Sequence, residues 1–261
     1  MTRTRLLIQI FPIIQLALIV TGWYMISVSI LLSLIVFLIA ALFLNFSLHI
    51  TVHHFIHFGY RNEFLKMLVE LLYTILLGFP TNLYRLQHYN HHRHNNKIGD
   101  VTSTWKKSGQ QIVAKNRFLY SFFWFVQKPN PYFISEAKEK GDLSKIHQIK
   151  ILVEILSILG VYLFFFLYSP LFALHYLGHV YLGWCFIALT NYGQHLPITY
   201  DTPIAYTYKS KWYNRLFFNN GLHFEHHFEP SKNYAALELK NENLIHQPHL
   251  FAGLSTNKIK K

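Results

Sequence analysis

Long apolar stretches with almost no charged residue dominate the sequence. They cover residues 6–22, 26–48, 149–168 and 171–190. Because a helix rises about 1.5 Å per residue, the stretch 26–48 is long enough to cross the roughly 30 Å hydrocarbon layer of a bilayer. The stretches come in two pairs, each joined by a short turn. The pattern therefore predicts an all-α fold with two helical hairpins in a membrane.

The first apolar stretch follows Arg3 and Arg5, as the apolar part of a signal peptide would. No small-x-small cleavage site follows it, and the next apolar stretch begins within a few residues. We therefore expect a retained membrane helix.

Two shorter apolar stretches, 64–79 and 118–126, lie between the hairpins. The first carries Lys66 and Glu70 and is expected to be interfacial or re-entrant. The second is too short to span and rich in aromatic residues, so it is expected to lie along the membrane surface. We predict one membrane-bound domain over residues 1–261, with four transmembrane helices, interfacial helices and a histidine-rich cap.

The composition agrees with a membrane protein. The chain is 52% apolar and only 14% charged, whereas a soluble domain is about 25% charged. The one cysteine, Cys185, excludes a disulfide framework, which is typical of a protein whose working parts face a reducing cytoplasm.

The net charge of +12 is distributed asymmetrically. Of the 24 Lys and Arg residues, two precede the first apolar stretch, 14 lie between residues 53 and 150, and eight follow residue 190. With four crossings all of them fall on one side, so the positive-inside rule places that side and both termini in the cytoplasm. A basic belt beside anionic headgroups explains the charge without nucleic acid.

Two histidine motifs share one spacing. The first is His88, His91 and His92, and the second is His223, His226 and His227. On a helix, residues three and four apart share a face, so each motif can direct its imidazoles at one small volume. Clustered neutral imidazoles are typical ligands of transition metals. The repetition makes solvated surface histidines a far weaker explanation.

Two further segments add candidate ligands. His49, His53 and His57 are spaced for one helical face, although only the last two need be ligands, and Asn191 and His195 lie one turn apart directly after the last apolar stretch. The candidate ligands are then His53, His57, His88, His91, His92, His195, His223, His226 and His227. Nine imidazoles exceed the three or four of a zinc site, which indicates two metal ions.

In the order and spacing of these groups and in the intervening hairpins, the chain resembles the membrane-bound fatty acid desaturase family, the histidine-box di-iron enzymes, from about residue 45 to 235. His53 and His57 resemble the first of the family's three histidine boxes, and the two repeated motifs resemble the second and the third. Glu225 and Pro230, beside the third, also stand where the family has such residues. Asn191 and His195 resemble an Asn-x-x-x-His element of the family that stands before the third box and supplies one more imidazole ligand. His54 stands where many members have Asp or Glu, which leaves the choice among His49, His53 and His54 open.

The resemblance implies two iron ions, molecular oxygen as co-substrate and a membrane lipid or acyl substrate that gains a double bond. It implies no catalytic residue beyond the metal ligands. Asp100, Asn191 and Glu225 are candidates for orienting ligands through their second ring nitrogens, and His49 and His54 are candidates for additional ligands.

The sequence has no haem motif and no glycine-rich dinucleotide loop, so electrons are expected from a separate ferredoxin or small cytochrome that docks on the basic face. One alternative is a hydroxylase or ketolase of a lipid or carotenoid on the same scaffold. Another is a histidine-rich metal transporter, but only His175 and His179 lie in the predicted membrane core.

Overall fold

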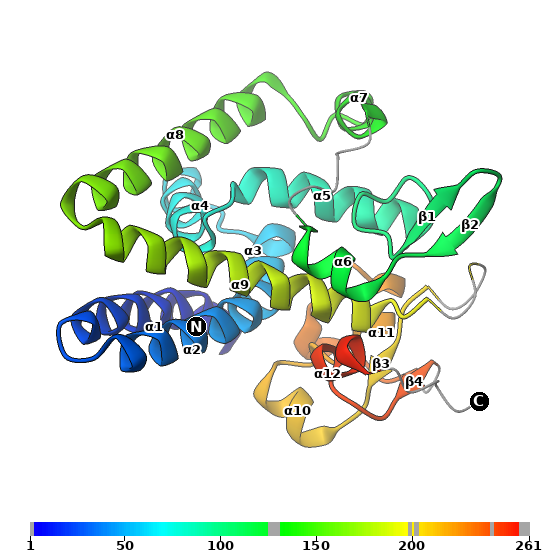
Figure 1. Cartoon of the computed structure of the whole chain (residues 1–261). Coiled ribbons are helices and arrows are strands. Elements are labelled where there is room, and N and C mark those ends of the chain that lie inside the picture. Colours follow the sequence, from blue (N-terminus) through cyan, green and yellow to red (C-terminus); the bar gives the residue numbers. More distant parts are fainter. Residues whose placement is uncertain (1–2, 125–130, 198–199, 201–203, 241–242, 256–261) are drawn as a thin grey trace. The chain divides into compact units, whose positions relative to one another are not determined.

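The computed structural model describes residues 3–124, 131–197, 200, 204–240 and 243–255. The chain is mostly helical with a few short strands, which confirms the predicted fold class (Figure 1). It packs into two compact units, one of residues 1–86 and 141–184 and one of residues 87–140 and 185–261. The single domain expected from the sequence stays a prediction.

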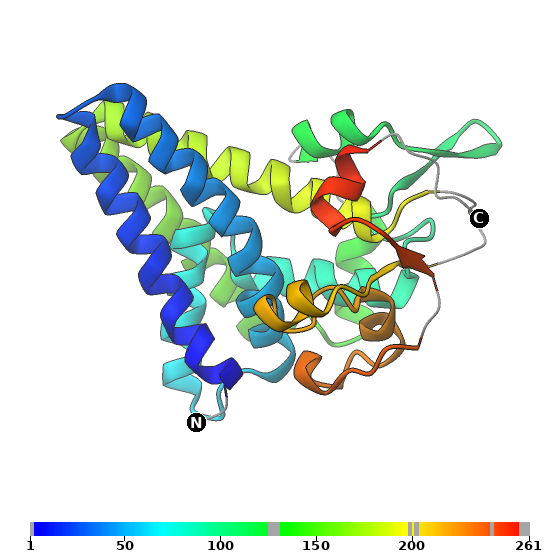
Figure 2. The same ribbon diagram turned by 90° about the horizontal axis from the view of Figure 1, so that it is seen from below.

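The first unit begins with a helical hairpin, α1 (Arg3–Ile26) and α2 (Ile30–Ser47), whose helices lie side by side (Figure 2). Two fully buried polar side chains bond across it. The Gln15 amide donates to the Ala40 carbonyl at 3.2 Å, and the Ser33 hydroxyl donates to the Gly22 carbonyl at 2.8 Å. These two bonds reduce the cost of burying the two side chains in an apolar hairpin.

Helix α2 continues through a π-helical turn, η1 (Leu48–Val52), into α3 (His53–Phe58). The His53 amide donates to the Leu48 carbonyl, five residues back, as a π turn requires. The sequence spacing assumed α-helix throughout, so this turn was not predicted. The turn includes His49 and ends directly before His53, and the single face expected for His49, His53 and His57 stays a prediction.

The second hairpin consists of α8 (Lys145–Tyr168) and α9 (Pro170–Gln194), with a tight turn at Ser169 (Figure 1). In the described part of the chain, three helical stretches are long and apolar enough to cross a membrane: Ile30–Phe58, α8 and α9. The apolar part of α1, Ile10–Ile26, is shorter.

Helices α4 (Glu63–Leu77) and α5 (Thr81–His94) are bent by 88° from one another and together form either a broken span or a re-entrant loop. The bend occurs at Gly78, whose φ of 59° lies in the left-handed region that glycine tolerates best. The expected interfacial stretch 64–79 thus corresponds to α4 and the bend.

The start of α5 is fixed by hydrogen bonds to its first backbone amides. The Thr74 hydroxyl accepts from the Thr81 amide at 3.1 Å, and the Glu154 carboxylate of α8 accepts from the Asn82 amide at 3.0 Å and from its side chain at 2.6 Å. These bonds satisfy donors that a helix start leaves unpaired, and a carboxylate is favourable there. They fix the beginning of the helix that carries His88, His91 and His92.

The second unit contains the end of α5, the end of α9 and a set of short elements: β1 (Trp105–Ser108), β2 (Gln111–Ala114), α6 (Arg117–Phe122), α7 (Pro131–Glu139), β3 (Thr207–Tyr208), α10 (Lys211–Leu216), α11 (His223–Phe228), η3 (Tyr234–Ala236), β4 (Leu244–Ile245) and α12 (His249–Leu254). Strands β1 and β2 form an antiparallel hairpin, and β3 pairs with β4 in parallel.

Helix α6 falls in the stretch 118–126 that the sequence predicts to be interfacial. Its side chains Phe118, Leu119 and Phe122 are exposed, as is Phe123 directly after it. Residues 125–126 lie outside the described residues. An exposed apolar surface suits a membrane interface, which stays a prediction.

The end of α9 packs directly on α12 at two glycines. A Cβ atom on Gly193 would lie 1.8 Å from the His249 carbonyl oxygen, and one on Gly253 would lie 2.1 Å from the Leu189 carbonyl oxygen. The two helices therefore approach backbone to backbone. This contact fixes the end of α9, and His195 follows that end by one residue.

Candidate metal centre

Four buried imidazoles gather in the second unit, from three segments far apart in the sequence. Each offers a ring nitrogen, and these nitrogens all lie within 4.8 Å of one another. The Nε2 atom of His223 lies 3.0 Å from Nε2 of His195 and 3.2 Å from Nε2 of His227. We call His91, His195, His223 and His227 the histidine quartet.

Three members of the quartet are oriented through their other ring nitrogen. The Nδ1 atom of His91 lies 2.7 Å from an Asp100 oxygen, and that of His195 lies 2.5 Å from the Ile204 carbonyl oxygen. The Nδ1 atom of His227 lies 2.8 Å from the Asn95 side-chain oxygen. Carboxylate, carbonyl and amide oxygens only accept, so each Nδ1 carries the proton and each Nε2 keeps a free lone pair.

The electrostatics favour neutral rings at three members of the quartet, His195, His223 and His227. Burial, together with the electrostatic effect of the neighbouring His91, lowers the pKa of His195 to about 3. Burial likewise holds the pKa of His223 and of His227 well below the usual histidine value, and the other imidazoles of the group add to this effect. Neutral imidazoles with free lone pairs are the form that binds metal ions.

Asp100 supplies the negative charge beside the quartet. Burial alone would raise the pKa of its carboxyl group, but the electrostatic interaction with His91 and hydrogen bonds from His91 and Thr102 hold that pKa well below its usual range. An ionised carboxylate on a histidine Nδ1 is a common second partner of metal-binding imidazoles, because it fixes the ring and makes Nε2 more basic.

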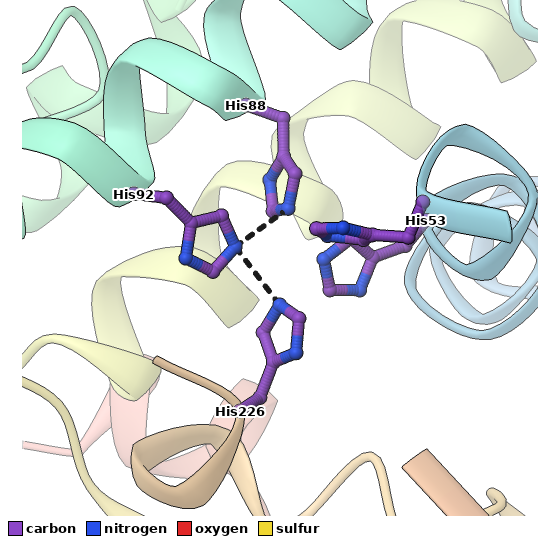
Figure 3. A group of neighbouring side chains, drawn as sticks. His53, His88, His92 and His226 are labelled. Atoms are coloured by element: carbon purple, nitrogen blue, oxygen red, sulfur yellow. Dashed lines mark hydrogen bonds between the residues drawn. The ribbon is translucent and has the colours of Figure 1, made fainter. Parts of the chain in front are cut away.

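A second group of imidazoles lies in the same unit. Nε2 of His92 is 2.8 Å from Nε2 of His88 and 2.9 Å from Nε2 of His226, so three rings converge through the same ring atom (Figure 3). His88 and His226 are buried and His92 is half-buried. Helix α5 therefore presents His91 to one group and His88 with His92 to the other.

The other candidate ligands, His49, His53, His54 and His57, belong to the first unit. His53 and His57 lie one turn apart on α3, with ring centroids 5.2 Å apart. The His54 ring is buried and packs against Phe58 with centroids 4.8 Å apart, and His49 is buried in the π turn.

Two of the residues expected to orient the imidazoles, Asn191 and Glu225, bond to residues and backbone groups near the ligands. The Asn191 amide donates to the Tyr120 hydroxyl at 2.6 Å and to the Thr102 carbonyl at 3.3 Å. Glu225 accepts from the Thr207 hydroxyl at 2.5 Å and from the Lys240 amide at 3.1 Å, and so ties α11 to β3. Both residues hold the backbone that carries the ligands.

Sequence reasoning missed three contacts to the quartet. The Thr102 hydroxyl lies 3.0 Å from Nδ1 of His91, the Asn95 side chain bonds His227, and the Ile204 carbonyl bonds His195. Asn95 left a usable signal, because an Asn-Asn pair shortly after a helical histidine motif indicates a left-handed helix end, and the φ of Asn95 is 46°. A backbone carbonyl leaves no side-chain signal at all.

The donor set fits a transition metal. In the part of the chain that the structure describes, Nε2 of His91 has no hydrogen-bond partner although it is buried. An unpaired buried nitrogen is costly unless something binds it. A metal ion among the four Nε2 atoms would satisfy that lone pair and hold the converging nitrogens of its neighbours.

Comparison with protein-family models gives a match to the fatty acid desaturase family over residues 13–252. A comparison with curated proteins gives no match.

Proposed function

The chain belongs to the fatty acid desaturase family, and from this premise we propose that it introduces a double bond into the alkyl chain of a membrane lipid. Membership makes the protein a desaturase-like oxidoreductase with a lipid substrate. The particular reaction, the metal, its ligands and the electron donor are our proposal.

We propose iron as the metal, with the histidine quartet as ligands of one ion. The observation that carries the proposal is the convergence of four buried ring nitrogens, three with protonated Nδ1 atoms held by acceptors. His88, His92 and His226 are proposed as ligands of a second ion. His53 and His57 are proposed to bind this second ion on the strength of their sequence spacing and the family's box order.

When bound, two irons supply the reduction of dioxygen and the removal of hydrogen atoms from an unactivated methylene pair. The chain's own residues prepare this chemistry. Asp100, the Ile204 carbonyl and Asn95 hold protons at Nδ1, so the Nε2 atoms stay free for binding. Burial of the quartet keeps bulk water away from the reacting atoms.

The proposed reaction balances without an acid or base side chain. The substrate loses two hydrogen atoms from neighbouring carbons, the donor supplies two electrons and water supplies two protons. Together they reduce one dioxygen molecule to two water molecules. We further propose that the metal centre and both termini face the cytoplasm, on the basis of the charge asymmetry.

The test combines product analysis with metal analysis. Cells that express the chain should gain lipids lighter by two hydrogens, and the purified protein should contain two irons per chain. His195→Ala should abolish the product and reduce the iron content, whereas His246→Ala, at an exposed histidine, should change neither.

A gain of one oxygen in the product would assign hydroxylation instead. Zinc without iron in an active preparation would overturn the choice of metal.

A further inference from the structure

The β1–β2 hairpin is an exposed, cationic element of the second unit. Its strands and turn are exposed apart from the half-buried Trp105 and Val113, and it projects beyond α6 in both views (Figures 1 and 2). From Val101 to Ser135 the sequence holds five Lys and Arg residues and no Asp or Glu. A single sign of charge on an exposed ribbon attracts partners of the opposite sign.

The strand register gives the hairpin no apolar face. Lys107 pairs with Ile112 and Lys106 pairs with Val113. Because successive strand residues point to opposite faces, each face carries a lysine. An element that lies in a membrane interface needs one continuous apolar face. The hairpin therefore suits an acidic protein better than a bilayer.

The base of the hairpin is bonded to the histidine quartet. The buried Thr104, directly before β1, donates its hydroxyl to the His195 carbonyl at 3.0 Å. Two residues earlier, the Thr102 hydroxyl lies 3.0 Å from Nδ1 of His91. The Trp105 ring packs edge-on against Tyr200 with centroids 5.7 Å apart. The hairpin is thus connected to His195 and to His91, in each case through a few covalent bonds and one hydrogen bond. A protein docked on the hairpin would lie at the start of both connections.

We propose that the β1–β2 hairpin is the docking site of an acidic electron-donor protein, which rests on the function proposed above. Lys106 and Lys107 pair with carboxylates of the donor. Each docking event transfers one electron as the donor's reduced iron–sulfur cluster is oxidised. Two such events, with two substrate hydrogen atoms and two protons, convert one dioxygen into two waters.

The test measures binding of a plant-type [2Fe–2S] ferredoxin to the full chain in nanodiscs of neutral phosphatidylcholine, at low and high salt. The variant Lys106→Glu/Lys107→Glu reverses the hairpin charge. The matched control Lys209→Glu/Lys211→Glu makes the same charge change at two exposed lysines of the same unit. The hairpin variant should lose about tenfold or more in association rate and show a flatter salt dependence, while the control changes by less than about twofold.

Equal losses in both variants, a loss in the control alone, or no ferredoxin binding by the unchanged chain would overturn the docking site. So would a loss that occurs in phosphatidylglycerol nanodiscs and is missing in phosphatidylcholine, because the hairpin would then bind lipid headgroups. Product formation with dithionite as reductant separates the two proposals. If the unchanged chain forms no desaturated lipid under either reductant, the proposed function fails, and the binding data still decide the docking site.

Discussion

Asp100 accepts hydrogen bonds from His91, from the Asn96 amide, and from both the amide and the hydroxyl of Thr102. An ionised carboxylate can accept this many bonds because its two oxygens offer about four acceptor sites in a small volume. At the scale of single residues, ring orientation in the quartet therefore depends on acceptors that face Nδ1.

Asp100→Asn should lower iron affinity by about 10- to 100-fold, the usual cost of losing a partner of a metal-binding histidine. The new amide would place a donor against donors and would remove the negative charge. Iron retention against a competing chelator measures the effect. Thr102→Val removes the hydroxyl that bonds His91 and Asp100 but keeps the carboxylate, so its loss should be smaller. Equal iron retention in all three proteins would contradict this role of Asp100.

Asn95→Gly should weaken iron retention by about tenfold. Glycine tolerates the positive φ of 46° at this position, so the backbone is undisturbed while the acceptor for His227 is lost. Asn95→Asp keeps an acceptor oxygen and should retain iron. Thermal unfolding of the metal-free proteins checks that the glycine variant still folds. If the two variants lose iron alike, the acceptor is not what orients His227.

At the scale of elements, the close approach of α9 and α12 predicts that a glycine-to-alanine substitution at the contact lowers stability, whereas it usually raises it. Glycine to alanine inside a helix normally stabilises by up to about 1 kcal/mol. Gly193→Ala should instead destabilise by about 1–3 kcal/mol, because its Cβ would overlap the His249 carbonyl. Gly178→Ala in the same helix has nothing within 4 Å and is the control.

Unfolding temperatures in detergent compare the two glycine variants. We also expect Gly193→Ala to lower the iron content, because a shift at the end of α9 moves His195. A Gly193→Ala protein as stable as the Gly178→Ala protein would contradict the backbone contact.

Sequence reasoning predicted the long elements of this chain well and the short ones poorly. The hairpins of α1 with α2 and of α8 with α9 follow from paired apolar stretches with few charged residues, of which three belong, among the described residues, to helices long and apolar enough to cross a bilayer. The π turn at Leu48–Val52 and the β1–β2 hairpin were missed, because no periodicity marks a π turn and the strands are four residues each. A Gly-Gln pair between the strands was the available signal: Gly109 has the positive φ, 62°, that a type II′ turn needs first.

At the scale of the whole molecule, the charge asymmetry predicts sidedness. In a Cys185→Ala background, Ser108→Cys on the hairpin should react with an impermeant maleimide only from the cytoplasmic side. Val28→Cys, in the turn between α1 and α2, should react only from the opposite side. Labelling of right-side-out and inverted vesicles measures both. Reaction of the two cysteines from one side would contradict the predicted topology.

The uncharged nitrogen donors of the quartet have a consequence for the living cell. Such a donor set ranks divalent ions by the Irving–Williams order, in which zinc and copper bind more tightly than ferrous iron. Correct loading then depends on which ion is abundant while the chain is being made. Protein produced under iron starvation should bind zinc in place of iron, and it should be folded but inactive.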